Sequence, residues 1–233
     1  LLAAILSCPL VAAQNNDSAP AEPVRRLLTG FEDLQEPQKT ASVLPDGTPE
    51  HYLRTTEGAW YFDPRIFTLS REKTTVRDGG NSLKIEFTPS SQFKMRYDRY
   101  TLTYMIFDKE LADWSAFETL EFDVRFDTII VGRDEIAGLQ FPSAPTAPAT
   151  PGGANIAEKD TWFHVSFPLP KAMPATKSMT VTFIIPKTWD QHFDGKKVLF
   201  YLDNLFLTRK SALKNGQAES ASGLYRIDPP VIG

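Results

Sequence analysis

The 233-residue chain has one cysteine and three histidines, and its charges nearly balance, with 25 Lys and Arg against 29 Asp and Glu. A single cysteine excludes a disulfide framework and a cysteine-rich zinc site. The net charge of −4 gives no electrostatic basis for nucleic-acid binding, which needs a clustered basic face. The sequence has no repeating glycine period and no sustained heptad, which excludes collagen and a coiled coil. It also has no Gly-x-Ser-x-Gly motif of a serine hydrolase and no glycine-rich loop that binds phosphate.

No apolar run at the start of the chain is long enough to span a bilayer, which takes about 20 residues. Residues 1–13 are apolar and end in Val11-Ala12-Ala13, which is typical of signal-peptide cleavage before Gln14. We therefore expect a partial signal peptide over 1–13 and a secreted or periplasmic protein. A lipid anchor at the cell surface through Cys8 is an alternative, because residues 5–8 resemble a lipobox, and a membrane is an expected partner only in that case. A buried terminal helix is the third interpretation.

Alternating apolar and polar residues run through most of the chain. Residues 118–127 show it best, with Leu120, Phe122, Val124 and Phe126 on one face of a strand. The same period of two covers residues 83–87, 163–169 and 179–185, and residues 198–207 are apolar on both faces, as in a central strand. Weaker strands are expected over 58–62, 66–72 and 101–107. Short strands separated by Pro and Gly turns, with no 12-residue helical stripe, predict an all-β fold, an antiparallel β-sandwich of jelly-roll type.

The expected organisation has a flexible lead-in over residues 14–25, the sandwich over 26–210 and a tail or linker over 211–233. Residues 141–154 carry four prolines and two glycines, which excludes a central strand. This segment is either an exposed hairpin insertion or a loop that shapes one wall of a binding cleft.

Five segments follow one another in an order that suggests a family. They start at residues 30, 78, 111, 162 and 199, and read GFED, DGGNSLKI, LADWS, WFHVSFPL and LFYLDNLFL. The succession resembles the galactose-binding-domain-like jelly rolls of carbohydrate-binding modules in secreted glycan-degrading proteins. The resemblance spans about residues 27–209 and implies a sandwich that binds carbohydrate. The same fold also carries binders of other ligands, so it does not by itself settle function.

The resemblance also implies a structural calcium ion where the first strand meets the last. The matching positions are Glu32 and Asp203, with the turn from Asp78 to Asn81 as a further donor of oxygen ligands. Calcium takes six to eight oxygen ligands. An acid within a strand as apolar as residues 198–207 is costly unless it is paired or metal-bound. The alternative is that Asp203 caps a turn or pairs with an arginine such as Arg26.

Aromatic side chains with a polar end suit sugars, because they offer a flat apolar body and a hydrogen-bonding group. Trp162 and His164 share one face of their strand, and Asp123 and Arg125 point away from the core side of theirs. If the two strands share a sheet, these residues form a polar and aromatic surface. Further candidates for ligand binding are Trp60, Tyr61, Arg96, Tyr104 and Trp189.

The expected function is secreted, non-catalytic binding of a polysaccharide or oligosaccharide by a calcium-stabilised sandwich, alone or beside an associated glycan-degrading enzyme. One alternative is a jelly-roll hydrolase or lyase that uses Glu121, Asp123, His164 or Arg96. Glu121 and Asp123 would have Cα atoms about 7 Å apart on one strand face, which glycoside hydrolysis permits but which any strand with alternating acids shows. The other alternative is a module that holds a protein partner.

Overall fold

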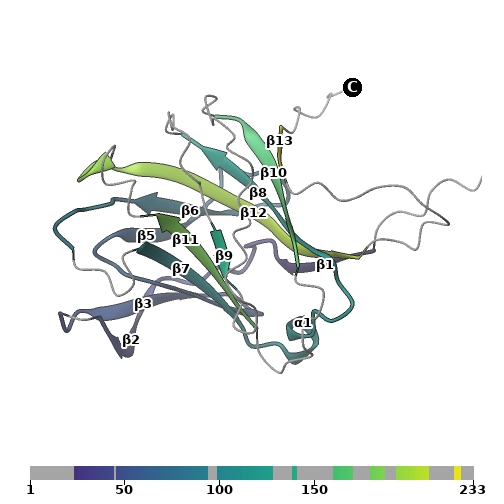
Figure 1. The fold of residues 1–233 in the computed structure, drawn as a ribbon, viewed down its shortest axis with the longest axis horizontal. Helices are drawn as coiled ribbons and strands as arrows, with labels where there is room; N and C mark the ends of the chain where they lie inside the picture. Colours follow the sequence, from purple (N-terminus) through teal and green to yellow (C-terminus); the bar gives the residue numbers. More distant parts are fainter. Residues whose placement is uncertain are drawn as a thin grey trace, which may run out of the picture.

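The structure, a computed structural model, describes residues 24–44, 46–93, 99–127, 138–140, 160–169, 179–186, 193–209 and 223–226. These residues form two antiparallel sheets that pack face to face (Figure 1). The fold is therefore an all-β antiparallel sandwich, as the alternating sequence pattern predicts.

The seven-stranded sheet has the order β13-β10-β8-β12-β6-β5, and β1 pairs with the C-terminal half of β12. Its strands are β1 (Val24–Thr29), β5 (Phe67–Glu72), β6 (Ser82–Phe87), β8 (Thr119–Phe126), β10 (Trp162–Pro168), β12 (Val198–Arg209) and β13 (Gly223–Arg226).

The six-stranded sheet has the order β2-β3-β4-β7-β11-β9. Its strands are β2 (Gln38–Val43), β3 (Pro49–Arg54), β4 (Gly58–Phe62), β7 (Arg99–Ile106), β9 (Gly138–Gln140) and β11 (Met179–Pro186).

From β6 to β12, successive strands alternate between the two sheets, which is the connectivity of a jelly roll. The short helix α1 (Lys109–Ala112) follows β7. The Asp108 side chain caps its first turn by accepting a hydrogen bond from the backbone N–H of Glu110. Within the described part of the chain, no helix is long and apolar enough to cross a membrane.

Every strand predicted from alternation is present, and residues 198–207 lie in the central strand β12. The structure adds β1, β2, β3 and the short β9, for which the sequence gives no clear period. It also differs at the C-terminal end, because β13 pairs with β10 within the segment expected to be a tail. The predicted signal peptide and the proline-rich segment 141–154 lie outside the described residues.

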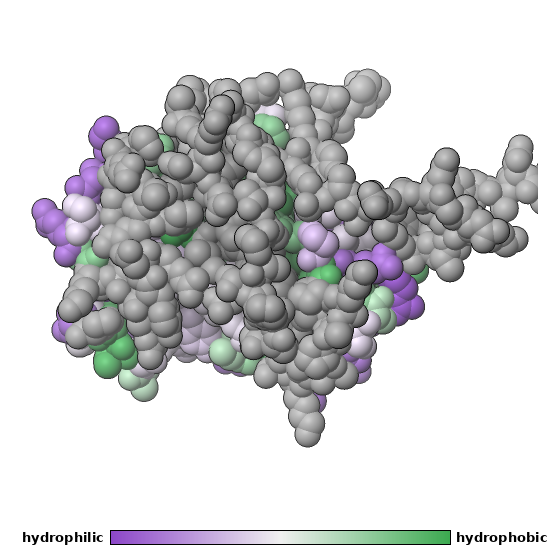
Figure 2. Space-filling model, viewed as in Figure 1, coloured by the Kyte–Doolittle hydropathy of each residue, from purple (hydrophilic) through white to green (hydrophobic). Residues whose placement is uncertain are grey.

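Rings from both sheets meet in the core. Phe122 of β8 contacts Phe183 of β11 edge-on, with ring centroids 5.4 Å apart. Phe87 of β6 meets Tyr100 of β7 in the same way at 5.0 Å. The abundant phenylalanines therefore act mainly in packing. Figure 2 shows hydrophilic side chains at the left and right edges of the molecule, with some hydrophobic ones beside them.

A β-bulge interrupts β12 in the middle of the seven-stranded sheet. Its register against β8 shifts between Asp203 and Phe206, and Asn204 adopts a left-handed backbone conformation with φ of 52°. Asparagine tolerates this conformation better than most residues. The extra residue lets Leu202 and Leu205 both lie in the core, while the Asn204 amide reaches a polar cluster on the outer face of the sheet.

Candidate functional site

The outer face of the six-stranded sheet carries an aligned row of polar and aromatic side chains. Along each strand, alternate residues enter the core, as Trp60, Leu102 and Phe183 do, so their sequence neighbours face outward. The strand register then places the outward residues in one line across the sheet, in the order Gln38, Tyr52, Tyr61, Thr103 and Thr182. We call these five residues the tyrosine face.

The two tyrosines of this face stack on each other and remain partly exposed. Their ring centroids are 5.9 Å apart with an interplanar angle of 27°. The Tyr52 hydroxyl donates a hydrogen bond of 2.6 Å to Oε1 of Gln38, and the Thr103 and Thr182 hydroxyls lie 3.1 Å apart. The face therefore combines two partly exposed aromatic rings with hydroxyl and amide groups at their sides.

Two charged residues of β3 lie on the same side of the strand as Tyr52, with Glu50 before it and Arg54 after it. Burial raises the pKa of the Tyr61 hydroxyl, the nearby Tyr52 and Glu50 raise it further, and the Arg54 charge opposes them. Tyr61 is therefore a neutral hydrogen-bonding group at neutral pH, within the electrostatic reach of both charges.

A second polar group lies on the outer face of the seven-stranded sheet, and we call it the histidine–carboxylate cluster. His164 of β10 lies between two side chains of β8, with Nδ1 2.8 Å from Asp123 Oδ1 and Nε2 3.3 Å from Glu121 Oε2. The Asn204 amide donates to the other oxygen of Asp123 at 3.0 Å, and the Thr119 hydroxyl donates to Glu121 at 2.9 Å. Strands β8 and β10 thus share a sheet, the arrangement on which the predicted surface depended.

The protonation states of this cluster follow from its contacts. Burial alone would lower the pKa of His164, but its hydrogen bonds to Asp123 and Glu121 outweigh burial and raise the pKa to about 9. Burial would raise the pKa of Glu121, and the bonds from His164 and Thr119 reverse this and lower it. At neutral pH His164 is charged and Glu121 is ionised, so the cluster is an ion-pair network that joins two strands.

The other predicted residues of this surface are also engaged within the protein. Arg125 pairs with Asp127 and Asp160, each at 3.2 Å. Trp162 lies opposite Arg125 in the strand register and is partly exposed. Of the surface predicted on β8 and β10, Trp162 is the aromatic group that a ligand can reach.

Two predicted ligand contacts, Trp60 and Tyr104, lie in the core instead. Both are 0% exposed, and their rings stack with centroids 4.8 Å apart. Neither can stack on a ligand at the surface, because both point inward from their strands, so this part of the prediction is wrong. Trp189 and Arg96 lie outside the described residues.

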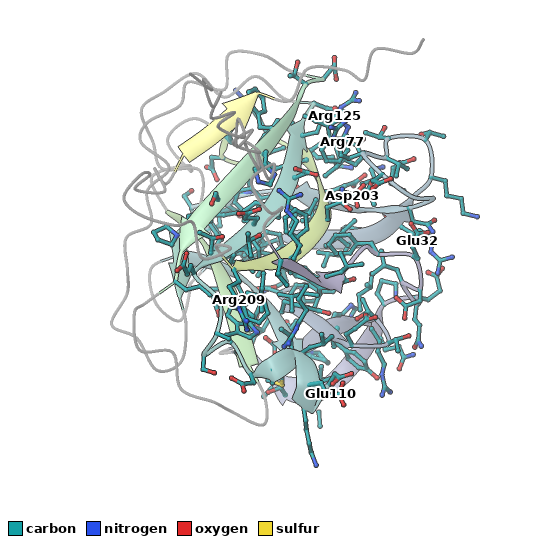
Figure 3. All side chains as sticks on the ribbon, turned by 90° about the vertical axis from the view of Figure 1, so that its right-hand side faces the viewer. Glu32, Arg77, Glu110, Arg125, Asp203 and Arg209 are labelled. Atoms are coloured by element: carbon teal, nitrogen blue, oxygen red, sulfur yellow. The ribbon has the colours of Figure 1, made fainter. Side chains whose placement is uncertain are left out.

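The residues predicted to bind calcium meet at one turn (Figure 3). Asp203 is fully buried and accepts hydrogen bonds from the backbone N–H groups of Arg77 and Asp78, at 2.9 and 3.2 Å. Burial raises its pKa to about 6 despite these bonds. Glu32 accepts from the Gly80 N–H at 2.7 Å and from the Asn81 side-chain amide at 2.8 Å.

The same turn contains an oxygen with no bonding partner. Oδ1 of Asn81 is buried and accepts no hydrogen bond. Carboxylate and amide oxygens are ligands of the kind that calcium takes, so the donors around this turn fit the ion in chemical type. Among the described residues, no group of three or more His, Cys, Asp or Glu side chains lies close enough together to hold a metal ion. Backbone carbonyls or water molecules would therefore have to complete the coordination shell of a calcium ion. The calcium site stays a prediction.

The sequence matches no protein-family profile and no curated protein. One similar solved structure is the CBM22-1 xylan-binding domain from Paenibacillus barcinonensis Xyn10C. It is 13% identical, with a TM-score of 0.36, and the match covers 77% of this chain and 97% of that domain.

The sequence interpretation included Tyr61 but missed the other four residues of the tyrosine face. A signal for two of them was present, because Thr103 and Thr182 occupy polar positions in strands whose alternate residues are apolar. Tyr52 and Gln38 gave no such signal, since β2 and β3 have weak alternation. Gln38 meets Tyr52 through the pairing of β2 with β3, and Tyr52 meets Tyr61 through the pairing of β3 with β4.

Proposed function

We propose that the protein binds a polysaccharide or oligosaccharide on the tyrosine face without cleaving it. The observation that carries this proposal is the stacked, partly exposed pair Tyr52 and Tyr61 on the outer face of a sheet. Sugars present C–H faces that pack on such rings and hydroxyls that bond to neighbouring polar groups. Thr103 and Thr182 supply hydroxyls beside the rings, and Gln38 supplies an amide.

The absence of cleavage is inferred from the histidine–carboxylate cluster. Glycoside hydrolysis needs one carboxyl group that donates a proton and another that stays ionised. The contacts of His164 instead favour the ionised form of Glu121, and His164 itself holds its proton up to about pH 9. These properties support a structural role for the cluster.

We further propose that the protein is exported, with residues 1–13 as part of a signal peptide, and that the secreted protein binds glycan alone or beside a degrading enzyme. The support is the apolar run that ends in Val11-Ala12-Ala13. Mass spectrometry of the N-terminus after expression in a host with a signal peptidase tests this, and a mature chain that starts at Gln14 is the expected result.

A structural calcium ion at the turn held by Glu32 and Asp203 is also proposed. The support is the buried Asp203 carboxylate, whose raised pKa shows that its ionised form is under-stabilised, and the unpartnered Asn81 oxygen. When bound, calcium would supply a positive charge that favours both carboxylates and ties the turn between β5 and β6 to the rest of the sandwich.

Affinity electrophoresis in native gels that contain one polysaccharide each tests the binding proposal. We expect retardation on at least one polysaccharide, with no release of reducing sugar or unsaturated product. Product release that disappears in Asp123→Ala or His164→Ala would show an enzyme. No retardation on any of a broad panel, together with specific capture of a protein, would favour the protein-binding alternative.

A further inference from the structure

Almost every arginine whose side chain the structure describes is bonded to another group of the protein. The two exceptions are Arg54 and Arg77, whose guanidinium groups have no hydrogen bond or ion pair within the described part of the chain. The bonded arginines and one partner of each are Arg25 with Glu121, Arg26 with the Glu110 carbonyl, Arg65 with Asp63, Arg71 with the Leu34 carbonyl, Arg125 with Asp127, and Arg209 with the Ala116 carbonyl.

Arg54 stands beside the tyrosine face. It lies two residues after Tyr52, on the same side of β3, and opposite Ala59 of β4, which places it diagonally across from Tyr61. Diagonal neighbours in an antiparallel pair lie about 7–8 Å apart, within reach of long side chains. The opposing effects of Arg54 and Glu50 on the Tyr61 hydroxyl agree with this placement. Arg54 is exposed, so its guanidinium is open to a ligand that lies on the rings.

We propose that Arg54 binds a carboxylate of the glycan, so that the ligand of the tyrosine face is a polysaccharide that carries uronic acid groups. This inference rests on the proposed function. A guanidinium group matches a carboxylate through two parallel hydrogen bonds, which adds both attraction and orientation. Arg54 would therefore fix the direction in which the sugar chain lies over Tyr52 and Tyr61.

The net charge of the protein limits how many carboxylates the ligand carries. At −4 the protein repels a densely charged polymer, whereas a single carboxylate can still pair with Arg54. The expected ligand is a mostly neutral polysaccharide with occasional uronates, in preference to a polymer made of uronates alone.

The test compares polysaccharides that differ only in their carboxylates. Glucuronoxylan, gum arabic and xanthan are each used native and after chemical reduction of the carboxyl groups to alcohols, with polygalacturonate as the densely charged probe. For at least one pair we expect the full-length protein to bind the native form about fivefold more tightly, as an exposed ion pair permits. Polygalacturonate should bind more weakly than that native polymer.

Two variants assign the effect to Arg54. Arg54→Gln should bind native and reduced forms equally, whereas Arg77→Gln, which removes the other unpartnered guanidinium, should keep the preference. Added salt should reduce the preference of the wild-type protein, because exposed charges are screened.

Each other outcome overturns a specific claim. Equal binding of native and reduced forms by the wild-type protein, or retention of neutral polysaccharides alone, contradicts the uronate inference and leaves glycan binding intact. A preference that survives in Arg54→Gln assigns it to another residue and also overturns the inference. No retention of any polysaccharide, neutral or acidic, overturns the proposed function itself.

Discussion

Tyr61 of β4 stacks on Tyr52 of β3 on the outer face of the six-stranded sheet, while Trp60, its immediate neighbour, stacks on Tyr104 inside the core. The two stacks are one residue apart and belong to opposite faces of the same sheet. Because successive side chains along a strand point to opposite faces, Trp60 packs in the core and Tyr61 lies on the outer surface. Stability and ligand binding should therefore respond separately to substitutions at these two positions.

Replacing Trp60 should unfold the protein more easily and leave the ligand surface in place. Trp60→Phe keeps an aromatic ring in the core, and Trp60→Ala removes it, which typically costs about 3–5 kcal/mol. Urea unfolding measures the loss. Folded Trp60→Phe should still bind glycan like the wild type, and a large loss of affinity without a loss of stability would contradict the core assignment.

The stability of the protein should fall as the solution becomes alkaline because of His164. The pKa of this group is about 9 in the folded protein and about 6.5 when unfolded, so folding favours its protonated form. The stabilisation is complete below pH 6.5 and is lost as the pH rises through about 9, with an upper size of about 3 kcal/mol. Urea unfolding between pH 6 and pH 9.5 measures this slope.

Two histidine variants distinguish the titration of His164 from other effects of alkaline pH on stability. His164→Gln should lose most of this slope and about 3 kcal/mol of stability at pH 6, since it leaves the buried Asp123 without its cation and leaves Glu121 with only Arg25, 3.6 Å away. His51→Gln should keep the slope, because His51 contacts Phe62 ring to ring and takes no part in the cluster. A slope that is unchanged in His164→Gln would show that another group titrates.

Removing divalent cations should lower the melting temperature if calcium is bound at the turn between β5 and β6. EDTA would leave the buried Asp203 carboxylate without a neutralising cation, and added calcium should restore the original melting temperature. Asp203→Asn should remove the response to both reagents. An identical melting temperature with EDTA and with calcium would count against the site, and the turn would then depend on its N–H donors to Asp203 and Glu32 alone.

The sandwich could be predicted from the sequence because its strands are locally periodic. In β8, Phe122 and Val124 face the core while Asp123 between them faces outward, and this is visible in residues 119–126 alone. The same reasoning puts His164 and Asp123 on one surface if the two strands share a sheet, and the strand register then sets them directly opposite each other.

Other features depend on contacts between distant segments and could not be read from local pattern. Trp60 and Tyr61 are adjacent aromatic residues in a strand whose faces are both largely buried, so its sequence does not say which one faces the core. The pairing of Tyr52 with Tyr61 depends on strand register. The bond from the Arg77 N–H to Asp203 joins residues 126 positions apart.

The most direct test of glycan binding on the tyrosine face is isothermal titration of one retained oligosaccharide into the wild type, Tyr61→Ala and Trp162→Ala. Trp162→Ala is the matched control, because it removes a partly exposed aromatic side chain from the opposite sheet. We predict that Tyr61→Ala weakens binding about tenfold, equivalent to about 1.4 kcal/mol, while Trp162→Ala binds like the wild type. Unchanged affinity in Tyr61→Ala with a loss in Trp162→Ala would contradict the account and place the ligand on the seven-stranded sheet.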